Sequence, residues 1–328
     1  MSNRSEVLVS VGELPDALRA GAQLLDVRWR LGEPHEAGYQ RFLDGHLPDA
    51  RFLDLEAVLT GPLSDPLLGR HPLPDADQLA AGLGALGIDP GRPIVVYDEP
   101  GSFAAGRAWW VLRWAGLSVR VLDGGVKAWS ASGGELVSGA APAVELTEPR
   151  LTVGHLPTLT ADEVATFDGV LIDVRAPERF RGEVEPIDPK PGHIPGAINR
   201  PVGLLWDADG RLPSDEELRR LTLGPLAIRH PGESRDLAPI APGHPREDRH
   251  SELRTPRHPE LTTPRHPGVG RDHETQAGGN RIAVYCGSGV SAAQTMLALA
   301  ALGIDAALYP PSWSGWSADP ERPIATGE

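Results

Sequence analysis

Short apolar runs alternate along the chain with segments in which apolar residues recur at helical spacing. Runs of strand length occur at residues 23–29, 50–53, 93–98 and 119–122. The helical pattern is found between them, at residues 75–86 and 103–117. Strands that are apolar on both faces and alternate with helices predict an α/β fold, with a parallel sheet flanked by helices on both faces. Ligands of such sheets bind beyond the carboxyl ends of the strands.

Capping boxes predict three further helix starts, at Ser10, Thr160 and Ser214. Each of these residues is followed three positions later by a glutamate. The hydroxyl accepts a hydrogen bond from the backbone N–H of the glutamate, whose carboxylate accepts one from the N–H of the first residue. Residues 138–158 lack such patterns and are rich in Pro, Gly and Ala, so we expect a linker there.

The strand pattern occurs twice, which indicates a tandem repeat. Three segments recur in the same order: LLDVR at 24–28 and LIDVR at 171–175, GHLPDA at 45–50 and GHIPGA at 192–197, and PIVVYD at 93–98 and RIAVYC at 281–286. The first two pairs are offset by 147 positions and the third by 188. Three matches in one order predict two related domains, the second of which contains extra sequence.

The extra sequence is the segment from about 226 to 279, which is rich in Pro, His and Arg. It contains the near-repeats RHPGESRD and RHPGVGRD. Because it has almost no apolar material to bury, we expect a disordered insert without a function of its own. Its histidines leave metal or partner binding as the alternative. Proline beside several of them opposes the helical i,i+4 spacing of many metal sites, so we expect no metal.

Composition limits the kinds of partner that the chain can have. The 328 residues are 40% hydrophobic and 23% charged, as in a soluble two-domain protein. The net charge of −14 argues against nucleic-acid binding, although a local basic pocket for a small anion stays possible. We find neither a signal peptide nor an apolar run long enough to cross a membrane. A single cysteine cannot form an intramolecular disulfide, so we expect a cytoplasmic location.

That cysteine, Cys286, follows an apolar strand directly and precedes an alanine- and leucine-rich helix. We expect this helix to begin at about Ser291, where Ser291-x-x-Gln294 forms a capping box. The loop between strand and helix contains Gly287, Ser288, Gly289 and Val290. Its two glycines allow the backbone N–H groups to turn inward. These donors and the helix N-terminus would stabilise a thiolate at Cys286, which is a ready nucleophile.

Three other interpretations of Cys286 are weaker. A lone buried cysteine commonly does no chemistry, but the strand, glycine-rich loop and capped helix favour a nucleophile. A phosphatase would need an arginine six residues after the cysteine, and that position is Ala292. Dithiol redox chemistry would need a second cysteine. Asp98 occupies the place of Cys286 in the first copy, so only the second copy can perform cysteine chemistry.

These motifs together resemble the tandem-domain rhodanese family, the thiosulfate and 3-mercaptopyruvate sulfurtransferases. The resemblance covers the chain except for about 226–279. It implies an inactive rhodanese-like domain at 1–140 and a catalytic one at 155–328. The loop CGSGVS resembles the mercaptopyruvate-type loop CGSGVT, whereas the thiosulfate type usually carries basic residues, as in CRKGVT.

The resemblance also implies roles for residues outside the loop. Arg179 matches the arginine that binds the donor's anion, and Trp29 matches a first-domain tryptophan that lines the cleft. His71 and Glu56 match a histidine and an aspartate that are proposed to form a relay with the loop serine, here Ser288.

Two family motifs are altered in this chain. The second carboxylate-binding arginine of mercaptopyruvate enzymes falls near Asp188, and Lys190 is the candidate to replace it. The family's DGSW motif is here Pro310-Pro311-Ser312-Trp313.

The sequence therefore predicts a sulfurtransferase that moves sulfur from a small anionic donor through a Cys286 persulfide. The uncharged loop favours 3-mercaptopyruvate over the dianion thiosulfate. The acceptor is expected to be a thiol, such as that of thioredoxin, or cyanide, and no cofactor is required. Thiosulfate as donor is the alternative within this class. A sulfur carrier or binding module with little turnover is the alternative of another class.

We predict that the insert is dispensable. A short Gly/Ser bridge from Gly224 to Asn280 is expected to leave thermal stability and turnover close to those of the full chain, because the entropy of loop closure changes only slowly with loop length. Thermal unfolding and steady-state kinetics measure both quantities. Loss of folding or of activity would show that the insert has a structural or functional role.

Overall fold

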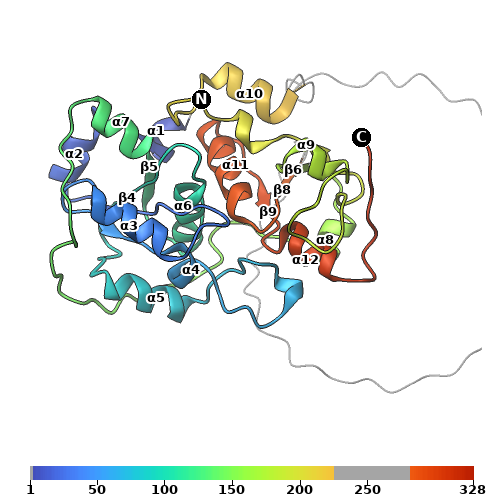
Figure 1. The fold of residues 1–328 in the computed structure, drawn as a ribbon, viewed down its shortest axis with the longest axis horizontal. Coiled ribbons are helices and arrows are strands. Elements are labelled where there is room, and N and C mark those ends of the chain that lie inside the picture. Colours follow the sequence, from blue (N-terminus) through green and yellow to red (C-terminus); the bar gives the residue numbers. More distant parts are fainter. Residues whose placement is uncertain (1–2, 225–280) are drawn as a thin grey trace, which may run out of the picture. The chain divides into compact units, whose positions relative to one another are not determined.

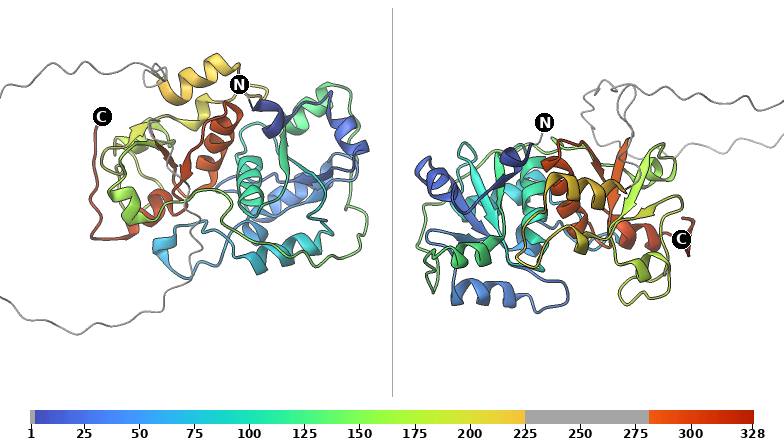
Figure 2. Two further views of the ribbon diagram at one scale, coloured as in Figure 1. Left: turned by 180° about the vertical axis from the view of Figure 1, so that it is seen from behind. Right: turned by 90° about the horizontal axis from the view of Figure 1, so that it is seen from above.

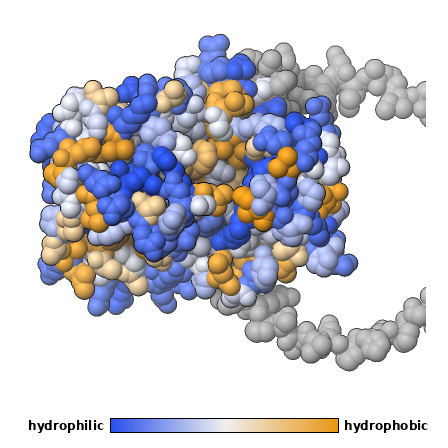
Figure 3. Space-filling view, in the orientation of Figure 1, coloured by the Kyte–Doolittle hydropathy of each residue, from blue (hydrophilic) through white to orange (hydrophobic). Residues whose placement is uncertain are grey.

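The computed structural model describes residues 3–224 and 281–328 (Figure 1). The insert expected at 226–279 lies outside the described residues. No helix in the described ranges is long and apolar enough to cross a membrane. On the face shown in Figure 3, hydrophilic residues alternate with scattered groups of apolar ones.

The first sheet contains five parallel strands in the order β1-β5-β4-β2-β3. The strands are β1 (Leu8–Val9), β2 (Gln23–Asp26), β3 (Arg51–Phe52), β4 (Ile94–Tyr97) and β5 (Val119–Leu122). The helices of this half are α1 (Arg4–Val7), α2 (Leu14–Arg19), α3 (Glu36–Asp44), α4 (Leu55–Val58), α5 (Ala76–Ala85), α6 (Ala104–Trp114) and α7 (Gly125–Ala131), with the 3-10 helix η1 (Pro66–Leu68).

The second sheet contains four parallel strands in the order β7-β6-β8-β9. They are β6 (Val170–Asp173), β7 (Ile198–Asn199), β8 (Ile282–Tyr285) and β9 (Ala307–Leu308). The helices are α8 (Ala161–Ala165), α9 (Pro177–Phe180), α10 (Asp215–Leu223), α11 (Val290–Ala301) and α12 (Ser312–Ala318), with the 3-10 helix η2 (Val202–Leu204). This order repeats β3-β2-β4-β5 of the first sheet, and a single bridge between Thr158 and Leu308 stands where β1 would be. The predicted α/β class with parallel sheets is confirmed.

Alternate residues of each strand enter different cores, so both faces of each sheet are covered. Leu25 and Val96 pack into a core that also receives Ile172 and Val284 of the second sheet. Their chain neighbours, such as Val95, pack into a separate core on the other face of the first sheet. The shared core contains α6 and α11, which lie side by side (Figures 1 and 2).

Close contact between α6 and α11 requires a glycine at position 106. A Cβ atom there would lie 2.7 Å from Cα of Gln294 on α11. These two helices follow the Asp98 loop and the Cys286 loop, respectively. The packing of α6 on α11 therefore brings the Asp98 loop and the Cys286 loop, which occupy corresponding positions in the two halves, close to each other.

The same buried polar contacts hold the corresponding loops in both halves. Asp26 pairs with Arg28 at 2.7 Å, and Asp173 pairs with Arg175 at the same distance. Each arginine also donates to a glycine carbonyl that precedes a histidine, Gly45 in the first half and Gly192 in the second. The charged pairs are almost fully buried, and the additional bonds offset the cost of removing them from water.

One predicted helix start is displaced. Helix α11 begins at Val290, because Gly289 adopts a φ of 84° and serves as its N-cap. Ser291 therefore lies inside the first turn, and the Ser291–Gln294 capping box does not form at the helix start. The box at Thr160 is present with both of its hydrogen bonds. Ser10 and Glu13 also exchange bonds, although the helix begins only at Leu14, and Ser214 caps α10 through the N–H of Glu217.

Candidate active site

Cys286 lies at the carboxyl end of the central strand β8, between the strand and helix α11. Its side chain is buried, and Sγ accepts a hydrogen bond from the backbone N–H of Gly289 at 3.0 Å. The loop is fixed by α12, since the N–H of Trp313 donates to the carbonyl of Cys286 at 2.9 Å. The N–H of Ser314 donates to the carbonyl of Gly287 at 2.8 Å. One backbone donor thus turns towards the sulfur; of the two glycines, only Gly289 adopts the positive φ that the sequence predicted.

Ser312 is a residue of this site that the sequence did not single out. Its hydroxyl accepts the N–H of Cys286 at 3.2 Å, donates to the carbonyl of Tyr309 at 3.0 Å, and lies 4.0 Å from Sγ. Ser312 has a φ of 53°, which is uncommon for a residue with a side chain. At the equivalent position of the first half, Gly125 has a φ of 55°. The signal that could have identified Ser312 was the family's DGSW motif, which is altered in this chain but keeps its serine.

Arg107 of α6 joins the cysteine loop to the first half of the chain. Its fully buried guanidinium donates to the carbonyl of Gly289 at 3.4 Å. It also donates to the carbonyls of Leu59 and His71 at 3.0 Å and of Pro72 at 3.2 Å. Burial lowers the pKa of Arg107 to about 10, so the group stays charged at neutral pH.

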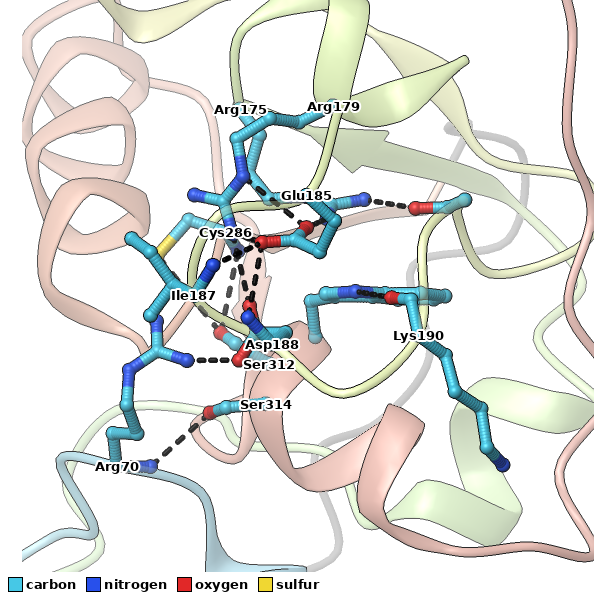
Figure 4. Close-up of polar contacts among 12 residues, drawn as sticks. Arg70, Arg175, Arg179, Glu185, Ile187, Asp188, Lys190, Cys286, Ser312 and Ser314 are labelled. Atoms are coloured by element: carbon cyan, nitrogen blue, oxygen red, sulfur yellow. Dashed lines mark hydrogen bonds and ion pairs between the residues drawn. The ribbon is translucent and has the colours of Figure 1, made fainter. Parts of the chain in front are cut away.

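Two arginines from different halves of the chain face the first peptide of the cysteine loop. A methyl group on Gly287 would lie 3.2 Å from Nη2 of Arg70 and 3.6 Å from Nη1 of Arg179. Arg179 also binds Glu185 at 2.6 Å and Asp188 at 2.9 Å, and Arg70 pairs with the other oxygen of Asp188 (Figure 4). Arg179 therefore lies where the resemblance predicts a cation, and Arg70 adds a second cation.

Lys190 lies elsewhere and does not face the cysteine loop in this structure. Its Nζ donates to the carbonyl of Asp319 at 3.2 Å, and its side chain extends away from Cys286 (Figure 4). The backbone explains this direction, because the carbonyl of Lys190 accepts the indole N–H of Trp313 at 3.0 Å. Arg70 directly precedes His71, which the sequence analysis had selected. This adjacency was the signal that could have identified Arg70.

Trp29, Glu56 and His71 lie together in the first half. The indole N–H of Trp29 donates to Glu56 at 3.0 Å, and the ring meets the imidazole of His71 edge-on at a centroid distance of 5.3 Å. Among the described residues, no hydrogen bond joins Glu56 to His71, so Trp29 stands between the two proposed relay groups. Glu56, Arg70 and His71 line a surface cavity of about 810 Å³.

The surroundings of His71 favour a neutral imidazole. Burial, followed by the charges of Arg107 and Arg70, lowers the pKa of His71 to about 3. Its Nδ1 is buried and has no hydrogen-bond partner among the described residues. A charged imidazole is therefore not available near neutral pH. In the described ranges, no group of three or more His, Cys, Asp or Glu side chains is placed to hold a metal ion.

A buried cysteine held by a backbone loop at the end of a parallel strand, in an α/β fold, fits a sulfurtransferase of the rhodanese type. The Rhodanese-like domain family matches residues 10–132. The putative thiosulfate sulfurtransferase SseB of Mycobacterium tuberculosis is 39% identical over all of this chain and 99% of its own. The probable 3-mercaptopyruvate sulfurtransferase of Pseudomonas aeruginosa is 34% identical, covering 93% of this chain and 92% of its own.

Solved structures agree with these relatives. The 3-mercaptopyruvate sulfurtransferase SseA of Escherichia coli matches with a TM-score of 0.68 and 28% identity, over 93% of this chain and 98% of its own. The chain belongs to the rhodanese family and is a sulfurtransferase.

The depressed pKa of His71 predicts a specific loss of stability in acid. In the unfolded chain the imidazole takes up a proton as the pH falls through about 6.5, whereas the folded protein resists protonation until about pH 3. Stability present above pH 6.5 is therefore lost on acidification, by about 2 kcal/mol at pH 5. Urea unfolding of the wild type and of His71→Gln at pH 7 and pH 5 measures this, and the variant is expected to lose correspondingly less. Equal losses in both proteins would contradict the assignment.

Proposed function

We propose that the protein transfers a sulfane sulfur from 3-mercaptopyruvate to a thiol or cyanide through a persulfide at Cys286. The observation that carries this proposal is the position of Sγ, 3.0 Å from the N–H of Gly289 in a loop followed directly by helix α11. Backbone donors and the N-terminal end of a helix stabilise negative charge on sulfur. They favour both the attacking thiolate and the persulfide anion that replaces it.

The chemistry needs no external oxidant. The Cys286 thiolate attacks the sulfur of the donor, the donor's C–S bond breaks, and its electron pair goes to the enolate of pyruvate. The resulting persulfide S–H loses a proton as the enolate gains one, which leaves pyruvate and a persulfide anion. Cyanide then attacks the outer sulfur and leaves as thiocyanate, which restores the thiolate. A thiol acceptor such as that of thioredoxin takes the outer sulfur in the same way.

The charges around the loop support a monoanionic donor. Arg70 and Arg179 carry two positive charges, and Asp188 and Glu185 balance them. A carboxylate is recognised by an arginine through charge-assisted, paired hydrogen bonds, and Arg179 is the residue proposed for this role. Trp29 stays a proposed substrate contact, because its ring packs against His71. Lys190 also stays a proposed contact, which would require its side chain to turn away from Asp319.

Ser288, His71 and Glu56 are proposed to assist the proton transfer to the enolate. Ser288 is buried within the cysteine loop and His71 is buried in the first half. Since the pKa of His71 is lowered to about 3, its imidazole would act in the neutral form, accepting a proton at one nitrogen as it gives one from the other. A cytoplasmic location belongs to the same proposal, because a free nucleophilic thiol persists in a reducing compartment.

Thiosulfate is the second candidate donor, and the pair of Arg70 and Arg179 favours it. Both guanidiniums face Gly287, which gives the site two cations although the loop itself is uncharged. The relative that is 39% identical carries the name putative thiosulfate sulfurtransferase. Attack of the thiolate on the outer sulfur would break the S–S bond and release sulfite.

Replacing Cys286 with serine tests the nucleophile. Cys286→Ser is expected to abolish sulfur transfer from either donor and to leave the unfolding temperature near that of the wild type. Mass spectrometry of the donor-treated wild type is expected to show one added sulfur, about 32 Da, on the peptide that contains Cys286. Activity in the variant, or sulfur on another residue, would overturn the assignment.

Replacing Arg179 tests donor recognition. Arg179→Ala is expected to lower kcat/KM for 3-mercaptopyruvate by the equivalent of about 1.5–3 kcal/mol, the range for a hydrogen bond to a charged group. Arg181→Ala serves as the matched control, since Arg181 pairs with the exposed Glu183 and is expected to leave kcat/KM unchanged. The wild type is expected to have a higher kcat/KM for 3-mercaptopyruvate than for thiosulfate. A higher value for thiosulfate would instead favour the second candidate.

A further inference from the structure

Asp188 occupies the space between the two cations that face the cysteine loop. One carboxylate oxygen binds Nη2 of Arg179 at 2.9 Å, and the other pairs with Nη1 of Arg70 (Figure 4). The side chain is only 1% exposed. A carboxylate in this position makes the same contacts with the two guanidiniums that the anionic group of a donor would make.

Asp188 is held less completely than the other acid at this site. Glu185 binds Arg175 as well as Arg179 and accepts the backbone N–H groups of Ile187 and Asp188. The carboxylate of Asp188 accepts hydrogen bonds only from Arg70 and Arg179 within the described part of the chain. Burial, partly opposed by the arginines, raises the pKa of Asp188, so its charged form is disfavoured there. Glu185 is thus held by more partners than Asp188.

Arg70 is firmly placed despite its position on a loop. Its backbone N–H donates to the hydroxyl of Ser314 at 3.1 Å, and the N–H of Ser314 donates to the carbonyl of Gly287 at 2.8 Å. Helix α12, which contains Ser314, also packs against η1, just before Arg70. These bonds fix the backbone of Arg70 beside the cysteine loop.

We propose that Asp188 is an internal competitor for the anionic group of the sulfur donor and sets the donor selectivity of the enzyme. The donor's anion binds Arg70 and Arg179 by replacing the Asp188 carboxylate. The charges of Arg70 and Arg179 are balanced by those of Asp188 and Glu185, so the site has no net charge. A neutral site disfavours binding of a dianion more than binding of a monoanion. The selectivity for sulfur donors rests on the proposed function, but the competition for an anion does not.

Isosteric alkylating reagents test the competition without any sulfur transfer. Iodoacetate is anionic and iodoacetamide is neutral, and both place a CH₂ group on the thiolate of Cys286 with loss of iodide. Because Cys286 is the only cysteine of the chain, one reaction rate per reagent describes the site. The ratio of the two rates cancels changes in thiolate content and reports the preference for an anion.

Asp188→Asn is expected to raise the iodoacetate-to-iodoacetamide rate ratio about tenfold, since one opposing charge is removed from a buried site. Asp162→Asn is the matched control, because it removes the same charge from an exposed pair with Arg322 and is expected to leave the ratio unchanged. Arg70→Gln is expected to lower the ratio. It provides a second variant if Asp188→Asn does not fold, as judged by thermal unfolding. An unchanged ratio in the Asp188 or Arg70 variant, or an equal rise in the control, would overturn the proposal.

Steady-state kinetics with the two sulfur donors extend the test to selectivity. In Asp188→Asn, kcat/KM is expected to rise about tenfold for thiosulfate and only about threefold for 3-mercaptopyruvate, because the dianion gains more from the released charge. An unchanged ratio between the donors would refute the role in selectivity. If neither donor puts sulfur on Cys286 while the alkylation ratio shifts, the proposed function fails and the internal competition stands.

Discussion

The buried guanidinium of Arg107 is the contact on which the active site depends. It comes from the half of the chain without a cysteine, and it binds carbonyl oxygens of both halves, among them those of His71 and Gly289. A buried charge without a carboxylate partner is costly to keep, and several carbonyl dipoles offset part of that cost. Because these carbonyls belong to two loops, the energy of the contact is available only when the loops are brought together. The positions of Arg70 and His71 beside the cysteine loop follow from this requirement.

The two halves share a framework and differ at the loop. Strands β4 and β8 are followed directly by Asp98 and Cys286, and the glycine three residues later has a φ of 84° in both. In the first half the carboxylate of Asp98 accepts the N–H of Ala105 at 2.9 Å, and burial raises its pKa to about 7. Asp98 therefore accepts its backbone bond from within α6, whereas Cys286 accepts its bond from Gly289, which precedes α11. The first half has no cysteine, but its Arg70 and Arg107 contact the cysteine loop of the second half.

The charge balance at the loop is a second consequence of this division. Arg179 comes from the second half and Arg70 from the first, whereas Asp188 bridges them. A site built from both halves can change its charge through residues that are far apart in sequence. The charge beside the cysteine loop can therefore change without any change in the loop itself.

The sequence by itself determined the class of fold and the family, and it singled out Cys286 as the proposed nucleophile. Alternating apolar runs specify parallel strands because burial on both faces leaves no polar face, and Cys286 was identified by its place between a strand and a glycine-rich loop. The start of α11 was displaced, since the backbone of Gly289 at positive φ ends the loop before Ser291 can cap the helix. Pairwise contacts such as Thr160 with Glu163 were predictable because they are local.

Only the tertiary structure decided which charges meet at the loop. Arg70 and Asp188 are 118 positions apart, and nothing in either local sequence predicts that they pair. Lys190, which is near Arg179 in sequence, instead directs its amine to Asp319 because the backbone around it is fixed by Trp313. Electrostatic interactions depend on distance in space, and this distance is set by the packing of α6 on α11 and by the carbonyls around Arg107. A motif can therefore single out the cysteine loop, whereas the charge that surrounds it depends on how the two halves pack.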